Sequence, residues 1–176
     1  MSWRVRGVLM SLRKQLGRLR RYGRRLRIWY AVATRLKGAE SADVRILRKS
    51  VLRSPRTSLH ELDHWQFPTV DADCTVISEG VGTFRTRAQT DDLFHALPGQ
   101  EPAVEQEIRA RLKPGDIFID AGANIGFYTV LASNLVGPTG RVVAVEMMPD
   151  TAAVLYENVR INHATNVHVI EAALSD

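Results

Sequence analysis

The sequence predicts an α/β fold built around a parallel sheet, and two short stretches carry this prediction. Residues 117–119 are an apolar run of strand length that ends on Asp120, and a glycine turn follows and opens a helix near Phe127. Residues 142–145 are a second apolar run, which ends on Glu146. Strands that alternate with helical segments in this way are typical of βαβ units with a parallel sheet.

The turn itself predicts a bound nucleoside. Gly122 and Gly126 lack side chains and tolerate positive φ, so a ligand can approach the main chain there. Glu146 lies 20 residues beyond Gly126. A doubly wound fold places an acid at about this distance to bind ribose hydroxyls. Turn, helix and second acid together favour a nucleoside-bearing cofactor.

The charge beside the turn favours one cofactor over another. The dinucleotide fingerprint requires a middle glycine, which is absent between Gly122 and Gly126. Asp120 stands directly before the turn and would repel a pyrophosphate, whereas it would attract an amine and a sulfonium. We therefore predict S-adenosylmethionine, with an NAD-binding oxidoreductase as the lesser alternative.

The residues around the turn resemble the FkbM-type methyltransferase family. The resemblance runs from about Glu101 to the last residue, and its most specific part is D-x-G-A-N-x-G-x-Y-T at residues 120–129. It implies a Rossmann-like class I methyltransferase fold in which S-adenosylmethionine donates a methyl group to a hydroxyl of a small molecule or glycan. It also implies a β-hairpin ahead of the core that covers the cofactor. One departure is Met147-Met148-Pro149, where the family more often has Glu-Pro.

The resemblance implies a set of cofactor-binding residues. Asp120 and the turn amides would lie near the methionine moiety, Glu146 at the ribose hydroxyls and Asp176 near the adenine. The full predicted set is Asp120, Gly122, Ala123, Asn124, Gly126, Tyr128, Thr129, Glu146 and Asp176. No residue is predicted as the general base, so the catalytic residues are left open.

A metal site is not predicted, although His60-Glu61-Leu62-Asp63-His64 matches H-E-x-x-H. Pro55 and Pro68 confine any helix here, Asp63 occupies a position that such zinc sites keep apolar, and a third ligand is missing. The single cysteine, Cys74, excludes an internal disulfide. We therefore expect a reducing, cytoplasmic setting. Peripheral contact with a membrane through residues 1–37 is the alternative.

Residues 1–37 predict a basic amphipathic helix. They contain 12 Lys and Arg and no acid, whereas the rest of the chain has a net charge of −7. An apolar stripe recurs at spacings of three, four and seven: Val5, Leu9, Leu12, Leu16, Leu19, Leu26, Tyr30 and Ala33. Such a helix suits an anionic membrane surface or a partner's groove, and the alternative is a solvated extension. Base-stacking aromatics are few, so a specific nucleic-acid partner is not predicted.

The rest of the chain divides into three predicted parts. Residues 38–70 are a connector in which a helix from Asp43 to Arg53 is stopped by Pro55. Residues 71–100 form a β-hairpin and a short helix beginning at Asp91. Residues 101–176 form the N-terminal half of the methyltransferase domain. Its predicted helices are 101–112, 127–136 and 149–162, and its strands are 117–120, 142–146 and 167–172.

Three strands are fewer than the resemblance implies for the whole sheet. We therefore expect a sheet truncated after its third strand, with an unprotected edge at residues 117–120 that invites pairing with another chain. The alternative function is a truncated, non-catalytic remnant or interaction protein that keeps only the cofactor-binding half.

Overall fold

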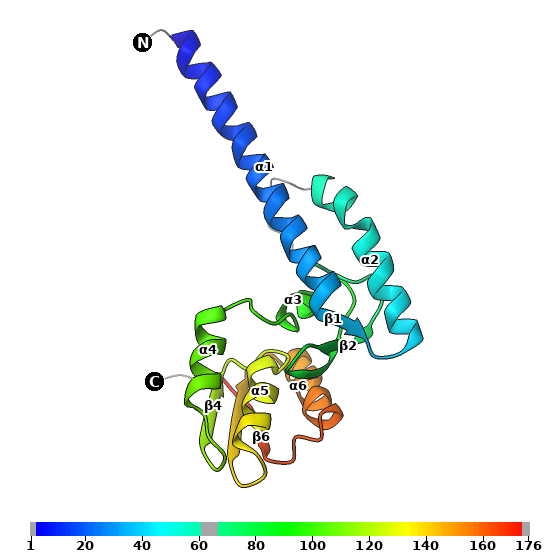
Figure 1. Ribbon diagram of the computed structural model, residues 1–176, viewed down its shortest axis with the longest axis vertical. Coiled ribbons are helices and arrows are strands. Elements are labelled where there is room, and N and C mark those ends of the chain that lie inside the picture. The colour runs from blue at the N-terminus through cyan, green and yellow to red at the C-terminus, as the bar shows by residue number, and fades with distance from the viewer. Residues whose placement is uncertain (1–2, 61–66, 174–176) are drawn as a thin grey trace.

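The chain forms two three-stranded sheets and a long N-terminal helix that projects away from them (Figure 1). The computed structural model describes residues 3–60 and 67–173, with side chains described from residue 13 onward except at residue 60. One sheet is antiparallel, in the order β1-β2-β3, and the other is parallel, in the order β4-β5-β6. The chain is thus an α/β fold with the predicted parallel sheet.

Two helices of the N-terminal part pack side by side: α1, Trp3–Arg35, and α2, Ser41–His60 (Figure 1). The prediction that Pro55 stops the second helix is wrong, because α2 continues through it. Ser50, Ser54 and Ser58 recur every fourth residue and are buried, so their small side chains allow close packing on this face of α2. Pro55 lies on the exposed face, where its missing N–H costs least. Within the described part of the chain, no helix combines the length and apolar content needed to cross a membrane.

The antiparallel sheet contains one more strand than the sequence predicted. Strands β2, Cys74–Ser78, and β3, Gly82–Thr86, form the predicted hairpin. Strand β1, Leu36–Gly38, follows α1 directly and pairs with β2, with Leu36 opposite Ser78. Three residues are too short to show an alternating pattern, so this strand could not be recognised from sequence. The short helix α3, Asp92–His95, follows the hairpin.

The C-terminal part contains the predicted order of elements. They are α4 (Pro102–Arg111), β4 (Ile117–Ala121), α5 (Phe127–Val136), β5 (Arg141–Glu146), α6 (Pro149–Ile161) and β6 (Val167–Glu171). Strand β5 lies between β4 and β6, and α5 and α6 pack on one face of the sheet. Strand β4 is buried on one face only, although residues 117–119 are all apolar. Ile117 and Ile119 point to the other face and are 70% and 65% exposed.

Both sheets contribute to one hydrophobic core. Phe84 of β3 stacks on Phe127 of α5, with ring centroids 6.0 Å apart. Val32 of α1, Val76 of β2 and Val130 of α5 are fully buried in the same cluster. The antiparallel sheet is therefore packed against the helical layer that also covers the parallel sheet.

Two asparagines of α6 connect the antiparallel sheet to the rest of the fold. Asn158 is fully buried; its Oδ1 accepts from the Arg85 N–H at 2.7 Å and its Nδ2 donates to the Ile125 carbonyl at 2.8 Å. Asn162 accepts from the Thr83 N–H at 2.8 Å and donates to the Thr83 carbonyl at 2.6 Å. These amides give the outer edge of β3 the hydrogen bonds that a neighbouring strand would otherwise supply.

We expect Asn158→Ala to lower the free energy of unfolding by about 3 kcal/mol, because it leaves a buried N–H and a buried carbonyl without partners. Urea unfolding measures the loss. The control is Asn134→Ala: Asn134 is exposed and donates one bond to the Val81 carbonyl, so we expect a loss of about 0.5–1 kcal/mol. Equal losses in the two variants would contradict the bridging role of Asn158.

Candidate functional site

The turn between β4 and α5 is fixed by backbone hydrogen bonds to the end of β5. The N–H groups of Gly122 and Ala123 both donate to the Val145 carbonyl at 2.9 Å. Gly122, Asn124 and Gly126 all have positive φ, at 80°, 49° and 93°. Glycine adopts these angles without strain, and asparagine is among the residues that tolerate them best. The sequence Gly-Ala-Asn-Ile-Gly therefore suits this turn closely.

The two glycines of the turn have different surroundings. A Cβ at Gly122 would meet nothing within 4 Å, so open space lies beside the backbone there. A Cβ at Gly126 would lie 2.5 Å from Leu155 Cδ1 of α6. The backbone at Gly122 thus has open space beside it, and the predicted ligand contact of Gly122 stays a prediction. Gly126 allows α5 to pack closely against α6, and its predicted ligand contact stays a prediction.

Asp120 is a buried carboxylate at the carboxyl end of β4. Its side chain accepts a 2.6 Å hydrogen bond from the Thr129 hydroxyl, and the residue is 8% exposed. Burial raises the pKa of Asp120 above its ordinary value; the Thr129 hydrogen bonds oppose this shift and the negative charge of Glu146 adds to it. Within the described residues, no cation is paired with Asp120. The ionised form of Asp120 is therefore poorly compensated and suits a positively charged ligand.

Glu146 at the end of β5 connects two loops. One carboxylate oxygen accepts from the Asn124 N–H and the other from the Met148 N–H, both at 2.9 Å. Glu146 is 7% exposed and its charge reaches Asp120, so the two predicted acids lie near each other. Each carboxylate oxygen has a further lone pair, so these bonds leave Glu146 able to accept from a ligand.

A cavity of about 200 Å³ lies against the turn. It brings together five of the predicted residues: Asp120, Gly122, Ala123, Asn124 and Tyr128. Gly126, Thr129 and Glu146 do not line it. Thr129 is fully buried and reaches the cavity only through its bond to Asp120.

The remaining wall of the cavity comes from a segment that sequence reasoning missed. His95, Leu97, Gln100 and Glu101 line it, together with Ile125 and Phe127. The hairpin strands β2 and β3, which the family resemblance placed over the cofactor, do not line it; the segment after the hairpin does. Nothing local in the sequence distinguishes these residues, because their position depends on how the hairpin packs against α6.

Tyr128 joins this segment to α5. Its hydroxyl donates to the Glu101 carboxylate at 3.1 Å. Burial and the nearby charge of Glu101 raise the pKa of Tyr128, so the phenol stays protonated and able to donate. The predicted cofactor residue Tyr128 thus holds one side of the cavity in place.

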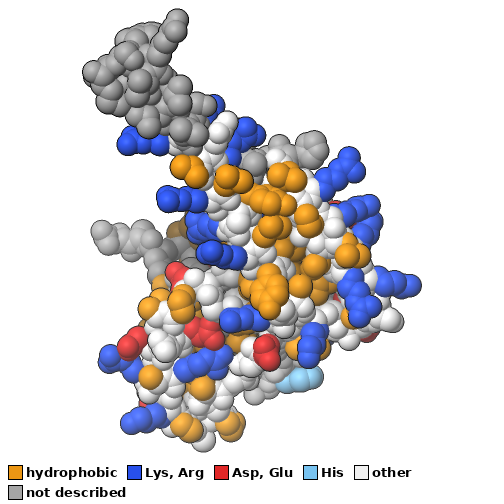
Figure 2. All heavy atoms as spheres, turned by 45° about the horizontal axis from the view of Figure 1, so that its top comes forward, with side chains coloured by type: hydrophobic (Ala, Val, Ile, Leu, Met, Phe, Trp, Pro, Cys, Tyr) orange, Lys and Arg blue, Asp and Glu red, His pale blue; other side chains and the backbone are white. Residues whose placement is uncertain are grey.

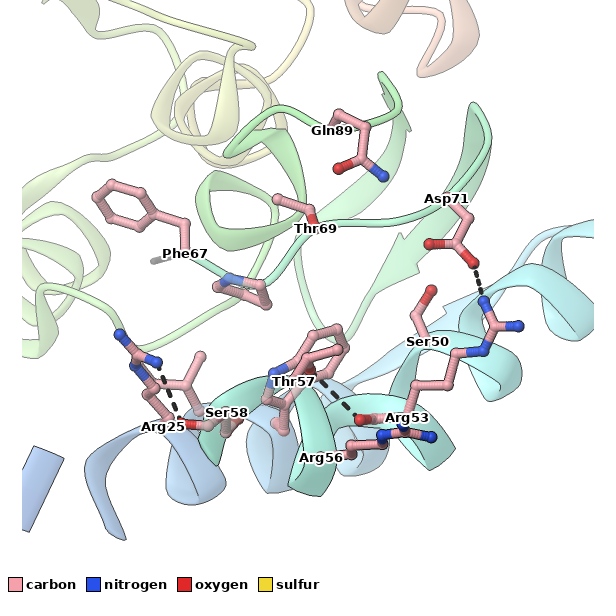
Figure 3. A pocket seen from close by; sticks show the side chains of 13 residues that line it. Arg25, Ser50, Arg53, Arg56, Thr57, Ser58, Phe67, Thr69, Asp71 and Gln89 are labelled. Atoms are coloured by element: carbon pink, nitrogen blue, oxygen red, sulfur yellow. Dashed lines mark hydrogen bonds and ion pairs between the residues drawn. The ribbon is translucent and has the colours of Figure 1, made fainter. Parts of the chain in front are cut away.

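A second and larger cavity, of about 490 Å³, lies between α1, α2 and residues 67–71 (Figure 3). Arg53 pairs with Asp71 at 2.6 Å on one side of it, and Arg25 donates to the Ser58 carbonyl at 3.1 Å on the other. None of the predicted cofactor residues that the structure describes lines this cavity. It is therefore separate from the site at the glycine turn.

Two of the predictions fall on residues that the structure does not describe. Asp176 lies outside the described residues, and so does the H-E-x-x-H stretch at 60–64 apart from the backbone of its first residue. In the described ranges, 3–60 and 67–173, no three His, Cys, Asp or Glu side chains gather as a metal site would require.

We expect Gly126→Ala to destabilise the fold more than Gly122→Ala. Both variants place a side chain at positive φ, at a cost of about 1–2 kcal/mol each. Only Gly126→Ala also forces a methyl group against Leu155, which adds about 1–3 kcal/mol. Urea unfolding of both variants measures the difference. A larger loss in Gly122→Ala would show that the space beside Gly122 is not open.

The chain is similar to known methyltransferases over part of its length. Residues 99–176 match the family model of the TRM5/TYW2 methyltransferase domain. An arsenite methyltransferase from Halobacterium salinarum is 32% identical over 97 residues, which are 53% of this chain and 25% of that protein. The chain thus spans about a quarter of the length of this curated relative.

Solved structures of methyltransferases also align with portions of this chain. Precorrin-6y C5,15-methyltransferase from Geobacter metallireducens is 33% identical, with a TM-score of 0.36, over 40% of this chain and 36% of that chain. M. jannaschii TYW2 in complex with AdoMet is 18% identical, with a TM-score of 0.45, over 62% and 45% of the two chains. The FkbM type stays a prediction. By its match to the TRM5/TYW2 family model, the segment that carries the glycine turn is similar to S-adenosylmethionine-dependent methyltransferase domains, as predicted.

Proposed function

We propose that this chain binds S-adenosylmethionine at the glycine turn and supplies the cofactor-binding part of a methyltransferase. The proposed reaction is methyl transfer to a hydroxyl oxygen of a small molecule or glycan. The observation that carries the proposal is the pairing of open space at Gly122 with the buried carboxylate of Asp120 in one cavity wall.

The electrostatics of Asp120 favour this ligand over a dinucleotide. A buried carboxylate with a raised pKa gains most from a ligand that brings positive charge, because the ligand then offsets the lost hydration. S-adenosylmethionine carries a sulfonium and an ammonium group, whereas the pyrophosphate of NAD would meet Asp120 with like charge. The cavity therefore supports a cationic cofactor.

The size of the cavity limits which end of the cofactor it holds. Its volume of about 200 Å³ is below the roughly 300–1,000 Å³ of most ligand pockets. It suits the methionine end beside Asp120 and the open space at Gly122. A ligand that also contacts Glu146 must extend past the cavity toward the end of β5, where the ribose is proposed to lie.

Methyl transfer requires the acceptor oxygen to approach the sulfonium methyl in line. When bound, S-adenosylmethionine would supply the methyl group and leave as S-adenosylhomocysteine, and the hydroxyl proton of the acceptor would pass to a base. The residues around the turn would bind and orient the cofactor. His95 and Glu101 are titratable side chains in the same cavity wall, and neither is assigned as the base.

We expect Asp120→Asn to weaken S-adenosylmethionine binding about tenfold or more while keeping or raising stability at neutral pH. Because the pKa of Asp120 is raised in the folded state, its stabilising contribution is full below its unfolded pKa of about 3.9 and is lost as pH rises through the folded value. The Asn variant should therefore be more stable than the natural protein at pH 7 and lose this advantage below about pH 4.

Titration calorimetry with S-adenosylmethionine and thermal unfolding across this pH range measure both effects. The control is Asp116→Asn, because Asp116 accepts the Lys113 N–H at the far end of β4 and lies away from the cavity. Unchanged binding in Asp120→Asn would contradict the assignment of the cationic end. Tighter binding of NADH than of S-adenosylmethionine would favour the oxidoreductase alternative.

The oxygen acceptor is tested by transfer of a labelled methyl group. We expect the label to appear in O-methyl products when hydroxyl-bearing small molecules or glycans are supplied, and Asp120→Asn should reduce the rate at low cofactor concentration. Mass spectrometry of the product identifies the methylated atom. Methylation at nitrogen or carbon would overturn the acceptor class, and cofactor binding without transfer to any acceptor would favour the non-catalytic alternative.

A further inference from the structure

From residue 13 onward, the apolar stripe of α1 lies mostly on the solvent side, while a different face of the helix packs against the body. Val32 and Arg25 are buried on the packing face. The stripe residues Leu16, Leu19 and Tyr30 are 56%, 66% and 72% exposed. Packing against the rest of the chain buries only one face of α1. The exposed stripe has no apolar partner in the described part of the chain.

Helix α2 extends the exposed stripe into a wider surface. A groove of about 590 Å³ lies between the two helices, and Ala33 of the stripe lines it together with Val44, Val51 and Leu52 of α2. Leu52 is 81% exposed, and Leu59, seven residues further along α2, is 53% exposed. Figure 2 shows hydrophobic side chains gathered over this pair of helices, with Lys and Arg side chains on both sides. We call this surface the α1–α2 face.

Arginines border the α1–α2 face in a regular pattern. Arg13, Arg20 and Arg27 recur every seven residues, so they follow one edge of the stripe, and all three are exposed. Arg48 lines the groove, and Arg45 is exposed on the same helix. No acidic residue occurs in residues 1–37. The face therefore combines exposed leucines with positive charge that nothing on α1 neutralises.

We propose that the α1–α2 face lies on the surface of an anionic lipid bilayer. Leucine side chains gain free energy by entering the boundary of the acyl region, while arginines beside them contact lipid phosphates at the same depth. Helix α1 then lies in the plane of the membrane, and the groove takes up apolar lipid atoms.

Other partners fit this face less well. A second copy of the chain would bring two arginine-bordered surfaces together, and their like charges would repel. A nucleic acid would contact the arginines but would leave Leu16, Leu19 and Leu52 without a favourable environment, since phosphates and base edges are polar. The pairing of exposed leucines with arginines favours the lipid surface.

Co-sedimentation of the full chain with lipid vesicles tests the proposal. We expect strong binding to vesicles of equal parts phosphatidylcholine and phosphatidylglycerol, weak binding to phosphatidylcholine alone, and loss of the difference at high salt. Leu19→Ser/Leu52→Ser should lower partitioning to both vesicle types about tenfold or more. Arg20→Gln/Arg27→Gln should lower binding to the anionic vesicles by about tenfold and leave binding to neutral vesicles unchanged.

Matched variants elsewhere control for general changes in hydrophobicity and charge. Val104→Ser/Tyr156→Ser removes two side chains that are 44% and 48% exposed on α4 and α6, and Arg111→Gln/Arg141→Gln removes two exposed charges from the body. Both should bind vesicles as the natural protein does, and circular dichroism confirms that every variant is folded. Four results would overturn the proposal: no sedimentation with anionic vesicles, equal losses in the control variants, binding to single-stranded RNA without lipid binding, or self-association that Leu19→Ser/Leu52→Ser abolishes.

Discussion

The buried amide of Asn158 is the contact on which the arrangement of this chain depends. It joins the backbone of β3 to the Ile125 carbonyl of the glycine turn, and so connects the antiparallel sheet to the candidate site. Asn162 secures the same strand one helical turn further on. With the hairpin held against α6, the segment that follows it, residues 95–101, is placed across the turn and closes the cavity. The shape of the site therefore depends on the contact between α6 and the hairpin as much as on the turn itself.

The two acids that end β4 and β5 have complementary roles. Glu146 accepts two backbone N–H groups and so keeps the turn and the loop after β5 in fixed positions. Asp120 accepts a hydrogen bond from the Thr129 hydroxyl and has a raised pKa, so a positively charged ligand would stabilise its ionised form further. A rigid acid beside a poorly compensated one is the arrangement expected of a site that is organised before its ligand arrives.

The parts of the structure that could be predicted from sequence are those set by short spacings. The β4–turn–α5 unit follows from an apolar run, an acid and two glycines within about ten residues, and α6 follows from Pro149 and its apolar spacing. The cavity wall at His95 and Glu101, the pairing of β1 with β2 and the bonds of Asn158 could not be predicted, because each depends on residues far apart in the chain.

Local rules also gave wrong expectations where tertiary packing outweighed them. Pro55 is a helix breaker by its chemistry, but α2 continues through it and buries the serines on its other face. Ile117 and Ile119 are apolar strand residues, yet they lie on the sheet face that α5 and α6 do not cover. Periodicity identified the leucine stripe of α1 correctly as one face but could not indicate that α1 packs through another.

The partners of each asparagine hydrogen bond lie far apart in the sequence, so β3 is synthesised long before the asparagines that pair with it. Arg85 and Asn158 are 73 residues apart, and Thr83 and Asn162 are 79 apart. During translation, the hairpin emerges from the ribosome long before α6, so the outer edge of β3 remains unpaired until the second asparagine has been added. Over that interval nascent chains on neighbouring ribosomes can pair through this edge, and a chaperone that shields it would favour correct assembly.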